Sequence, residues 1–278
     1  MEGLIPLIAS VLCFSLPPIL YRKGLERYES TFRANFVRIL YTLPVLAISI
    51  PSLRSVSIEV LMLAFCVGLL GGVVGDVAYL TSMKILGAGL ATALSYTYPV
   101  FVAPLASLTI GEELGYATIV GLILVVAGTW LASYEECERV GIAWRGVALA
   151  LSAAISWAAA SVIAKIVLQR MDPLTLAFLR NVSVALLLSW TAPTKLSDYV
   201  SKHALLLGIG SIVALGLGLY FYYQAIALVG ATTTSIATSA APAITIVASR
   251  FLLRERYSAR KLLGAALAIT GSIVAVVF

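Results

Sequence analysis

Of the 278 residues, 61% are hydrophobic and only 12% are charged, and the mean hydropathy is +1.02. A soluble domain of this length would need far more charge to cover its surface, so the composition indicates an integral membrane protein. The net charge of +6 does not indicate nucleic acid, because the basic residues lie at the ends of apolar stretches, where they meet lipid headgroups. One histidine and three scattered cysteines give no metal-ligand spacing, so we expect neither metal nor cofactor.

The apolar residues form long stretches separated by short connections. A helix that spans a membrane needs ~20 apolar residues. Ten stretches of this kind run over residues 3–21, 32–50, 59–83, 88–109, 115–133, 146–168, 174–191, 204–228, 232–252 and 259–278. The sequence therefore predicts an all-α integral membrane protein with ten transmembrane helices and no soluble domain.

The second half of the chain repeats the first at one constant spacing, without gaps over the best-matched stretch. Shared apolar bias would not align the rare residues that match: Gly87 with Gly230, Pro99 with Pro242, Glu112 with Glu255, Gly121 with Gly264 and Gly128 with Gly271. The match divides the chain into residues 1–137 and 138–278, with five helices each. Because five is odd, the second copy enters the bilayer from the opposite side, and we expect two inverted five-helix repeats.

Basic residues in the short connections predict the orientation. In the ten-helix arrangement, fourteen Lys and Arg residues fall on one side and only Arg54, Lys165 and Arg170 on the other. Because positively charged loops stay in the cytoplasm, this count predicts that both termini lie outside.

Asp76 is the only acidic residue well inside an apolar stretch. A charged carboxylate at the bilayer centre costs about 2.5–3.5 kcal/mol on insertion scales, so this side chain must face a wet cavity, pair with a cation or stay protonated. One hypothesis is a group that couples transport to protons or binds a substrate amine. The other is a structural ion pair with Lys84, Lys165 or Arg180. The repeat equivalent is Leu219, so either role belongs to one half only.

Arg38 and Arg180 lie about two turns inside their apolar stretches, where a charge is costly. They are candidates for structural pairing across helices or for anion binding, and Lys84 and Lys165 are the further basic candidates.

Prolines and polar residues mark the candidate cavity. Pro99 and Pro242 fall in the middle of predicted helices, where each removes a backbone hydrogen bond, and we expect them to act as hinges. Hydroxyl and aromatic side chains concentrate in a few stretches, although many such hydroxyls bond to the backbone of their own helix. The candidates for substrate binding are Ser15, Asp76, Tyr79, Ser95, Tyr98, Trp157, Tyr220, Tyr223 and Thr238.

Each half also contains an ordered series of short motifs. In the first half these are Ala78–Tyr79, Gly87, Tyr96–Thr97–Tyr98–Pro99, Gly111–Glu112, Gly121 and Gly128. In the second half they are Tyr222–Tyr223, Gly230, Pro242, Glu255, Gly264 and Gly271. In this order and in duplicate they resemble the EamA-type module of the drug/metabolite transporter superfamily, and Arg38 and Arg180 match an arginine common in its second helix. Arg254 departs from the pattern, because the family has a glycine there.

The resemblance implies a secondary active transporter in the cell membrane. Such proteins move small organic metabolites by alternating access, most often amino acids or related compounds and outward, around a cavity formed by the first, third, fourth, sixth, eighth and ninth helices. Relatives usually have cytoplasmic termini, which opposes the charge count. The basic residues leave an exchanger of anionic or phosphorylated metabolites as the alternative. A channel or an intramembrane enzyme fits less well, because the halves differ at Asp76 and no catalytic motif is present. The expected partners are a small-molecule substrate, lipid and possible coupling protons, for a monomer or homodimer.

Overall fold

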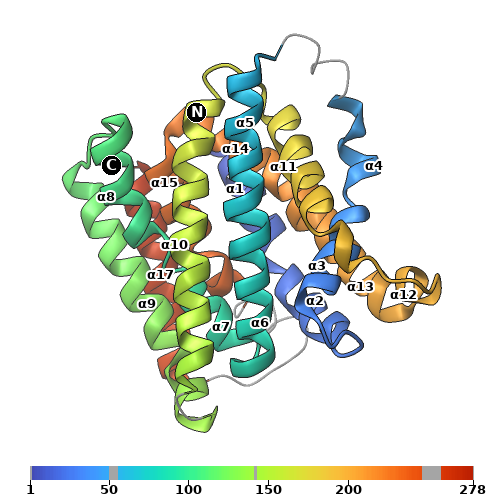
Figure 1. The fold of residues 1–278 in the computed structure, drawn as a ribbon. Helices are drawn as coiled ribbons and strands as arrows, with labels where there is room; N and C mark the ends of the chain where they lie inside the picture. Colours follow the sequence, from blue (N-terminus) through green and yellow to red (C-terminus); the bar gives the residue numbers. More distant parts are fainter. Residues whose placement is uncertain (1, 50–55, 141–142, 246–257, 278) are drawn as a thin grey trace.

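The computed structural model describes residues 2–49, 56–140, 143–245 and 258–277, and all regular elements within these ranges are helices (Figure 1). Six of the described helices are long and apolar enough to span a membrane: Leu4–Leu25, Ile58–Leu86, Ala88–Ile110, Trp144–Val167, Lys202–Val229 and Ala259–Val277. Shorter apolar helices cover Tyr116–Ala132 and Pro173–Leu187. The prediction of an all-helical protein with several membrane-spanning segments is confirmed.

The first two predicted stretches are each interrupted, where the sequence indicated continuous helices. The first contains α1 (Leu4–Ser15) and α2 (Pro17–Leu25), because Pro17 and Pro18 lack the N–H groups that would continue α1. The second contains α3 (Thr31–Leu40) and the short α4 (Leu43–Leu46), which begins with a proline in its first turn.

Two long helices contain a π-helical segment, which the sequence did not predict. In the first, η2 (Gly68–Gly75) joins α5 (Ile58–Val67) to α6 (Asp76–Leu86). In the second, η4 (Ile212–Gly218) joins α13 (Lys202–Ser211) to α14 (Leu219–Val229). We call η2 and η4 the π segments. They end at Gly75 and Gly218, which are equivalent positions of the repeat, so the same irregularity occurs in both halves.

Each of these long helices ends at a glycine with a left-handed backbone. Gly87 has a φ of +84° and Gly230 a φ of +91°, a region in which other residues are strained. The chain reverses there into α7 (Ala88–Ser95) and α15 (Ala231–Thr238). Pro99 begins the next helix, α8 (Pro99–Ile110), and Pro242 lies in the helical residues 241–245, so both prolines lie just after a helix break.

Two helices at the periphery, α9 (Tyr116–Val140) and α17 (Ala259–Val277), pack against each other through glycines. A Cβ atom on Gly128 would lie 2.6 Å from the Gly264 carbonyl oxygen, and one on Gly121 would lie 2.6 Å from the Gly271 carbonyl oxygen. The repeated glycines therefore let two backbones touch.

Two neighbouring helices lie close against the π segment η2 in the interior of the molecule. The neighbouring helices are α10 (Trp144–Val167) and α11 (Pro173–Leu187), which are followed by the short elements η3 (Ser189–Thr191) and α12 (Ser197–Val200). A Cβ atom on Gly72 would lie 3.0 Å from Arg180 Cζ, and one on Gly75 would lie 2.5 Å from Trp157 Cδ1. Glycine at these positions lets two large polar side chains lie directly against the π segment.

Candidate functional site

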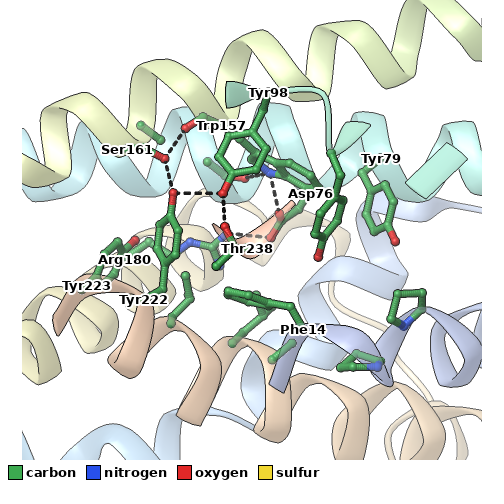
Figure 2. Close-up of a pocket in the computed structure, with 18 of the residues that line it drawn as sticks. Phe14, Asp76, Tyr79, Tyr98, Trp157, Ser161, Arg180, Tyr222, Tyr223 and Thr238 are labelled. Atoms are coloured by element: carbon green, nitrogen blue, oxygen red, sulfur yellow. Dashed lines mark hydrogen bonds and ion pairs between the residues drawn. The ribbon is translucent and has the colours of Figure 1, made fainter. Parts of the chain in front are cut away.

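A cavity lies among these helices and encloses about 800 Å³ of empty space, counted to its open mouth (Figure 2). Aromatic residues are the largest group on the cavity wall: Phe14, Tyr21, Tyr79, Tyr96, Tyr98, Trp157, Tyr222 and Tyr223. The charged residues on the wall, within the described part of the chain, are Arg38, Asp76 and Arg180.

These three charged side chains form a buried ion cluster. Asp76 is the first residue of α6, and its Oδ2 atom lies 2.8 Å from Arg38 Nη2 and 2.7 Å from Arg180 Nη2. Arg38 comes from α3 and Arg180 from α11, and the side chains are at most 5% exposed. Two guanidinium groups pair with one carboxylate, so the formal charge of the cluster is +1.

An asparagine connects each arginine to a π segment. Asn35 Oδ1 accepts a hydrogen bond from Arg38 Nε (2.8 Å), and Asn35 Nδ2 donates to the Gly72 carbonyl (2.7 Å). Asn181 Oδ1 accepts from Arg180 Nη1 (2.9 Å), and Asn181 Nδ2 donates to the Leu215 carbonyl (3.0 Å). Gly72 and Leu215 have the same spacing as Gly87 and Gly230, so the two asparagines bond to equivalent carbonyls of the two repeats.

Trp157 occupies the remaining oxygen of the carboxylate. Its Nε1 atom lies 3.1 Å from Asp76 Oδ1 and 3.1 Å from the Gly71 carbonyl oxygen, as Figure 2 shows for Asp76. The indole ring also packs against Tyr79, Tyr96 and Tyr98 at centroid distances of 5.2–6.3 Å. Both oxygens of Asp76 are thus bonded to side chains of the protein.

Hydroxyl groups connect the two helix breaks, one after α7 and the other after α15. Tyr98, at the break between α7 and α8, has its hydroxyl 2.5 Å from Thr238 Oγ1 and 3.3 Å from the Tyr222 hydroxyl. The Tyr222 hydroxyl lies 2.8 Å from Ser161 Oγ. Ser239 Oγ donates to the Tyr96 carbonyl at 2.7 Å, which joins the two breaks directly.

Lys84 and Lys165 are not on the cavity wall. Lys84 Nζ donates to the carbonyls of Tyr28 and Glu29, and Lys165 Nζ donates to those of Ile226 (2.9 Å) and Ala227 (3.1 Å). Neither amine pairs with Asp76, because both reach backbone carbonyls near helix ends. Of the three predicted partners only Arg180 contacts Asp76, and the second arginine, Arg38, was not among them.

Of the predicted substrate-binding residues, the cavity wall contains Asp76, Tyr79, Tyr98, Trp157, Tyr223 and Thr238. Ser15, Ser95 and Tyr220 lie outside it. Ser15 Oγ bonds to the Val11 carbonyl of its own helix (2.7 Å), and Tyr220 packs beside Phe221 with ring centroids 5.1 Å apart. Ser95 is buried, and its hydroxyl has no hydrogen-bond partner among the described residues.

Several residues that build the site were not predicted from the sequence. Phe14 lies on the wall and is the repeat equivalent of Trp157, which was a usable signal. Asn35 and Asn181 are fully buried amides within apolar stretches. Because a buried polar group needs a hydrogen-bond partner, these two asparagines were a second usable signal. Tyr21 lies under the Arg38 guanidinium at 4.8 Å from ring centroid to Cζ, a contact that no sequence pattern indicates.

Apolar helices of membrane-spanning length around a lined, partly polar cavity are the architecture of a membrane transport protein. Comparison with known proteins makes this specific. The model of the EamA-like transporter family matches residues 1–134 and again residues 144–277. The chain therefore belongs to the EamA-like transporter family and is a multi-pass membrane protein.

Individual relatives agree with this assignment. A protein of Archaeoglobus fulgidus named as an uncharacterized transporter is 28% identical over 270 residues, which cover 95% of this chain and 94% of the relative. The uncharacterized transporter YvbV of Bacillus subtilis is 30% identical over 68% of this chain and 63% of its own length. A solved crystal structure superimposes with a TM-score of 0.75 over 99% of this chain and 96% of its own, at 19% identity, which indicates the same fold.

Proposed function

We propose that this chain is a secondary active transporter that moves small organic metabolites across the cell membrane by alternating access. The observation that carries the proposal is the aromatic cavity of about 800 Å³ with a buried ion cluster on its wall, inside a bundle of apolar helices. The family resemblance favours amino acids or related compounds as substrates and export as the direction.

We further propose that the chain has ten transmembrane helices in two inverted repeats, residues 1–137 and 138–278. Three described features recur at equivalent positions of the two halves and support this duplication: the π segments, the left-handed glycines and the proline-associated breaks. Repeats of five helices with opposite orientation can rock about a shared central site, which is how such proteins expose it to each side in turn.

The breaks near Pro99 and Pro242 support a hinge role in this motion. Hydrogen bonds join them across the two repeats, through Tyr98 and Thr238 and through Ser239 and the Tyr96 carbonyl. A helix that is already interrupted at these points can bend without losing further backbone hydrogen bonds.

An exchanger of anionic or phosphorylated metabolites is the second candidate. The excess positive charge of the ion cluster favours the anionic part of this alternative, because two guanidinium groups face one carboxylate. Proton coupling through Asp76 is the alternative role for that residue. The geometry favours charge compensation instead, since both carboxylate oxygens are bonded to side chains of the protein.

Counterflow in proteoliposomes tests the proposed function. Purified protein is reconstituted into vesicles preloaded with an unlabelled candidate compound, and uptake of the labelled compound is followed. A carrier accelerates this exchange well above the rate in empty vesicles, and the R38Q/R180Q double variant abolishes the acceleration. Uptake that is independent of preloading would contradict the proposal and indicate a channel.

A further inference from the structure

The cavity has an excess of one positive charge in surroundings that screen charge poorly. Within the described chain its wall contains Arg38, Arg180 and Asp76 as charged groups, and most of the rest is aromatic or aliphatic. Because an unpaired buried charge is costly, a ligand that neutralises this excess gains free energy on binding, and a ligand with the wrong charge loses it.

Asp76 lowers this charge from +2 to +1 without being available as a ligand itself. Its Oδ2 atom contacts both guanidinium groups, and its Oδ1 atom accepts from Trp157. Each arginine, in contrast, keeps one guanidinium nitrogen available as a hydrogen-bond donor. Among the described residues no acceptor bonds to Arg38 Nη1 or Arg180 Nε, whereas Asn35 and Asn181 hold the other ends of the two guanidinium groups.

The repeat does not provide a second carboxylate. Leu219 occupies the position of the second half that is equivalent to Asp76, and it lines the same cavity. The excess charge therefore depends on how many of the two equivalent positions hold an acid. This asymmetry offers a way to set the charge of the cavity to +2, +1 or 0 by single substitutions at matched positions.

We propose that Asp76 determines the charge selectivity of the cavity and that the preferred substrate class is a monocarboxylate with an aromatic or apolar body. The carboxylate of the substrate binds the free guanidinium donors, and the aromatic wall packs against the body. A dianion, such as a dicarboxylate or a phosphate monoester, brings one negative charge too many. This inference rests on the proposed carrier function and narrows its substrate.

The test measures binding of three probes that share a phenyl group: phenylacetate (monoanion), phenylsuccinate (dianion) and phenylalanine (zwitterion). Isothermal titration at neutral pH gives the ratio of their affinities. The wild-type protein binds phenylacetate more tightly than phenylsuccinate, by about tenfold for one unpaired charge in a partly screened site. D76N reverses this order, whereas D76E, which keeps the charge, retains it.

The position of Leu219 provides the matched series. L219D makes the cavity neutral, so the affinity ratio shifts from phenylacetate towards phenylalanine, whereas L219N adds polarity without charge and keeps the wild-type ratio. Gel filtration and the thermal unfolding midpoint identify variants that do not fold, and the two pairs of variants test the proposal independently.

Each outcome has a distinct meaning. An affinity ratio that is the same in wild type and folded D76N, or the same in L219D and L219N, would overturn the charge selectivity while leaving a carrier in place. A wild-type protein that binds none of the three probes would overturn this inference, whereas the carrier proposal fails only when counterflow is absent for the wider set of candidate metabolites.

Discussion

At the scale of single residues, the ion cluster depends on two amides that lie outside the cavity wall. Asn35 and Asn181 each connect an arginine to a carbonyl of a π segment, and Asn181 also bonds to Thr42 Oγ1 at 2.9 Å. A π-helical stretch leaves backbone groups without regular partners, and a buried carbonyl needs one. The asparagines satisfy this need and fix the guanidinium groups at the same time.

We expect N181L to destabilise the protein clearly. The substitution leaves the Leu215 carbonyl and one donor of Arg180 without their partners, at about 1–3 kcal/mol for each buried unsatisfied group. The thermal unfolding midpoint in detergent should fall by several degrees. L186A on the same helix is the control, because Leu186 is 65% exposed to the surroundings of the bundle. Equal midpoints for N181L and L186A would contradict the structural role of Asn181.

At the scale of helices, glycine determines which pairs can touch. The contact between α9 and α17 brings Gly128 and Gly264 together so closely that neither tolerates a Cβ atom without movement of the backbone. These helices line none of the cavity wall in the described chain, so their close packing serves stability and not the site.

G128A should therefore destabilise the protein although alanine is the better helix former. Overpacking a close contact costs about 1–3 kcal/mol, more than the helix propensity that alanine adds. G115A is the matched control, since a Cβ atom there would meet only Thr118 Oγ1, at 3.8 Å. Unfolding midpoints of the two variants and wild type provide the comparison. A G128A protein as stable as G115A would show that α9 and α17 separate readily.

Features with a local or periodic signal could be predicted from the sequence. These are the apolar helices, the turns at Gly87 and Gly230 and the glycine contacts, because each follows from composition, spacing or backbone freedom. The π segments could not be predicted, because an extra residue in a helical turn does not change the pattern of a stretch that is apolar on all sides. The pairing of Arg38 with Asp76 could not be predicted either, because it depends on how two helices are rotated against each other.

At the scale of the whole molecule, two equivalent arginines each form an ion pair with an acidic residue of the other repeat. Arg27 and Arg170 occupy matching positions of the two halves. Arg27 Nη2 lies 2.8 Å from Asp198 Oδ1, whereas Arg170 Nη1 lies 4.0 Å from Glu59 Oε2, with both of the latter side chains at least 70% exposed. In the proposed inverted arrangement these ion pairs lie at opposite surfaces of the membrane, one tightly closed and the other loose.

This arrangement predicts opposite accessibility for the two acidic positions. In a cysteine-free background, an impermeant thiol reagent should label E59C in intact cells and D198C only after lysis, if the charge count has placed the termini correctly. The reverse result would place both termini in the cytoplasm and still agree with inversion. Labelling of both positions from one side would contradict the inverted repeats.

The paired π segments also bear on the history of the gene. A π-helical turn arises when one residue is inserted into a helix that is already packed on both sides. Both halves contain such a turn at equivalent positions, ending at Gly75 and Gly218. The simplest explanation is that the insertion occurred once, in an ancestral protein of half this length that assembled as an antiparallel pair, and that fusion then copied it into both halves.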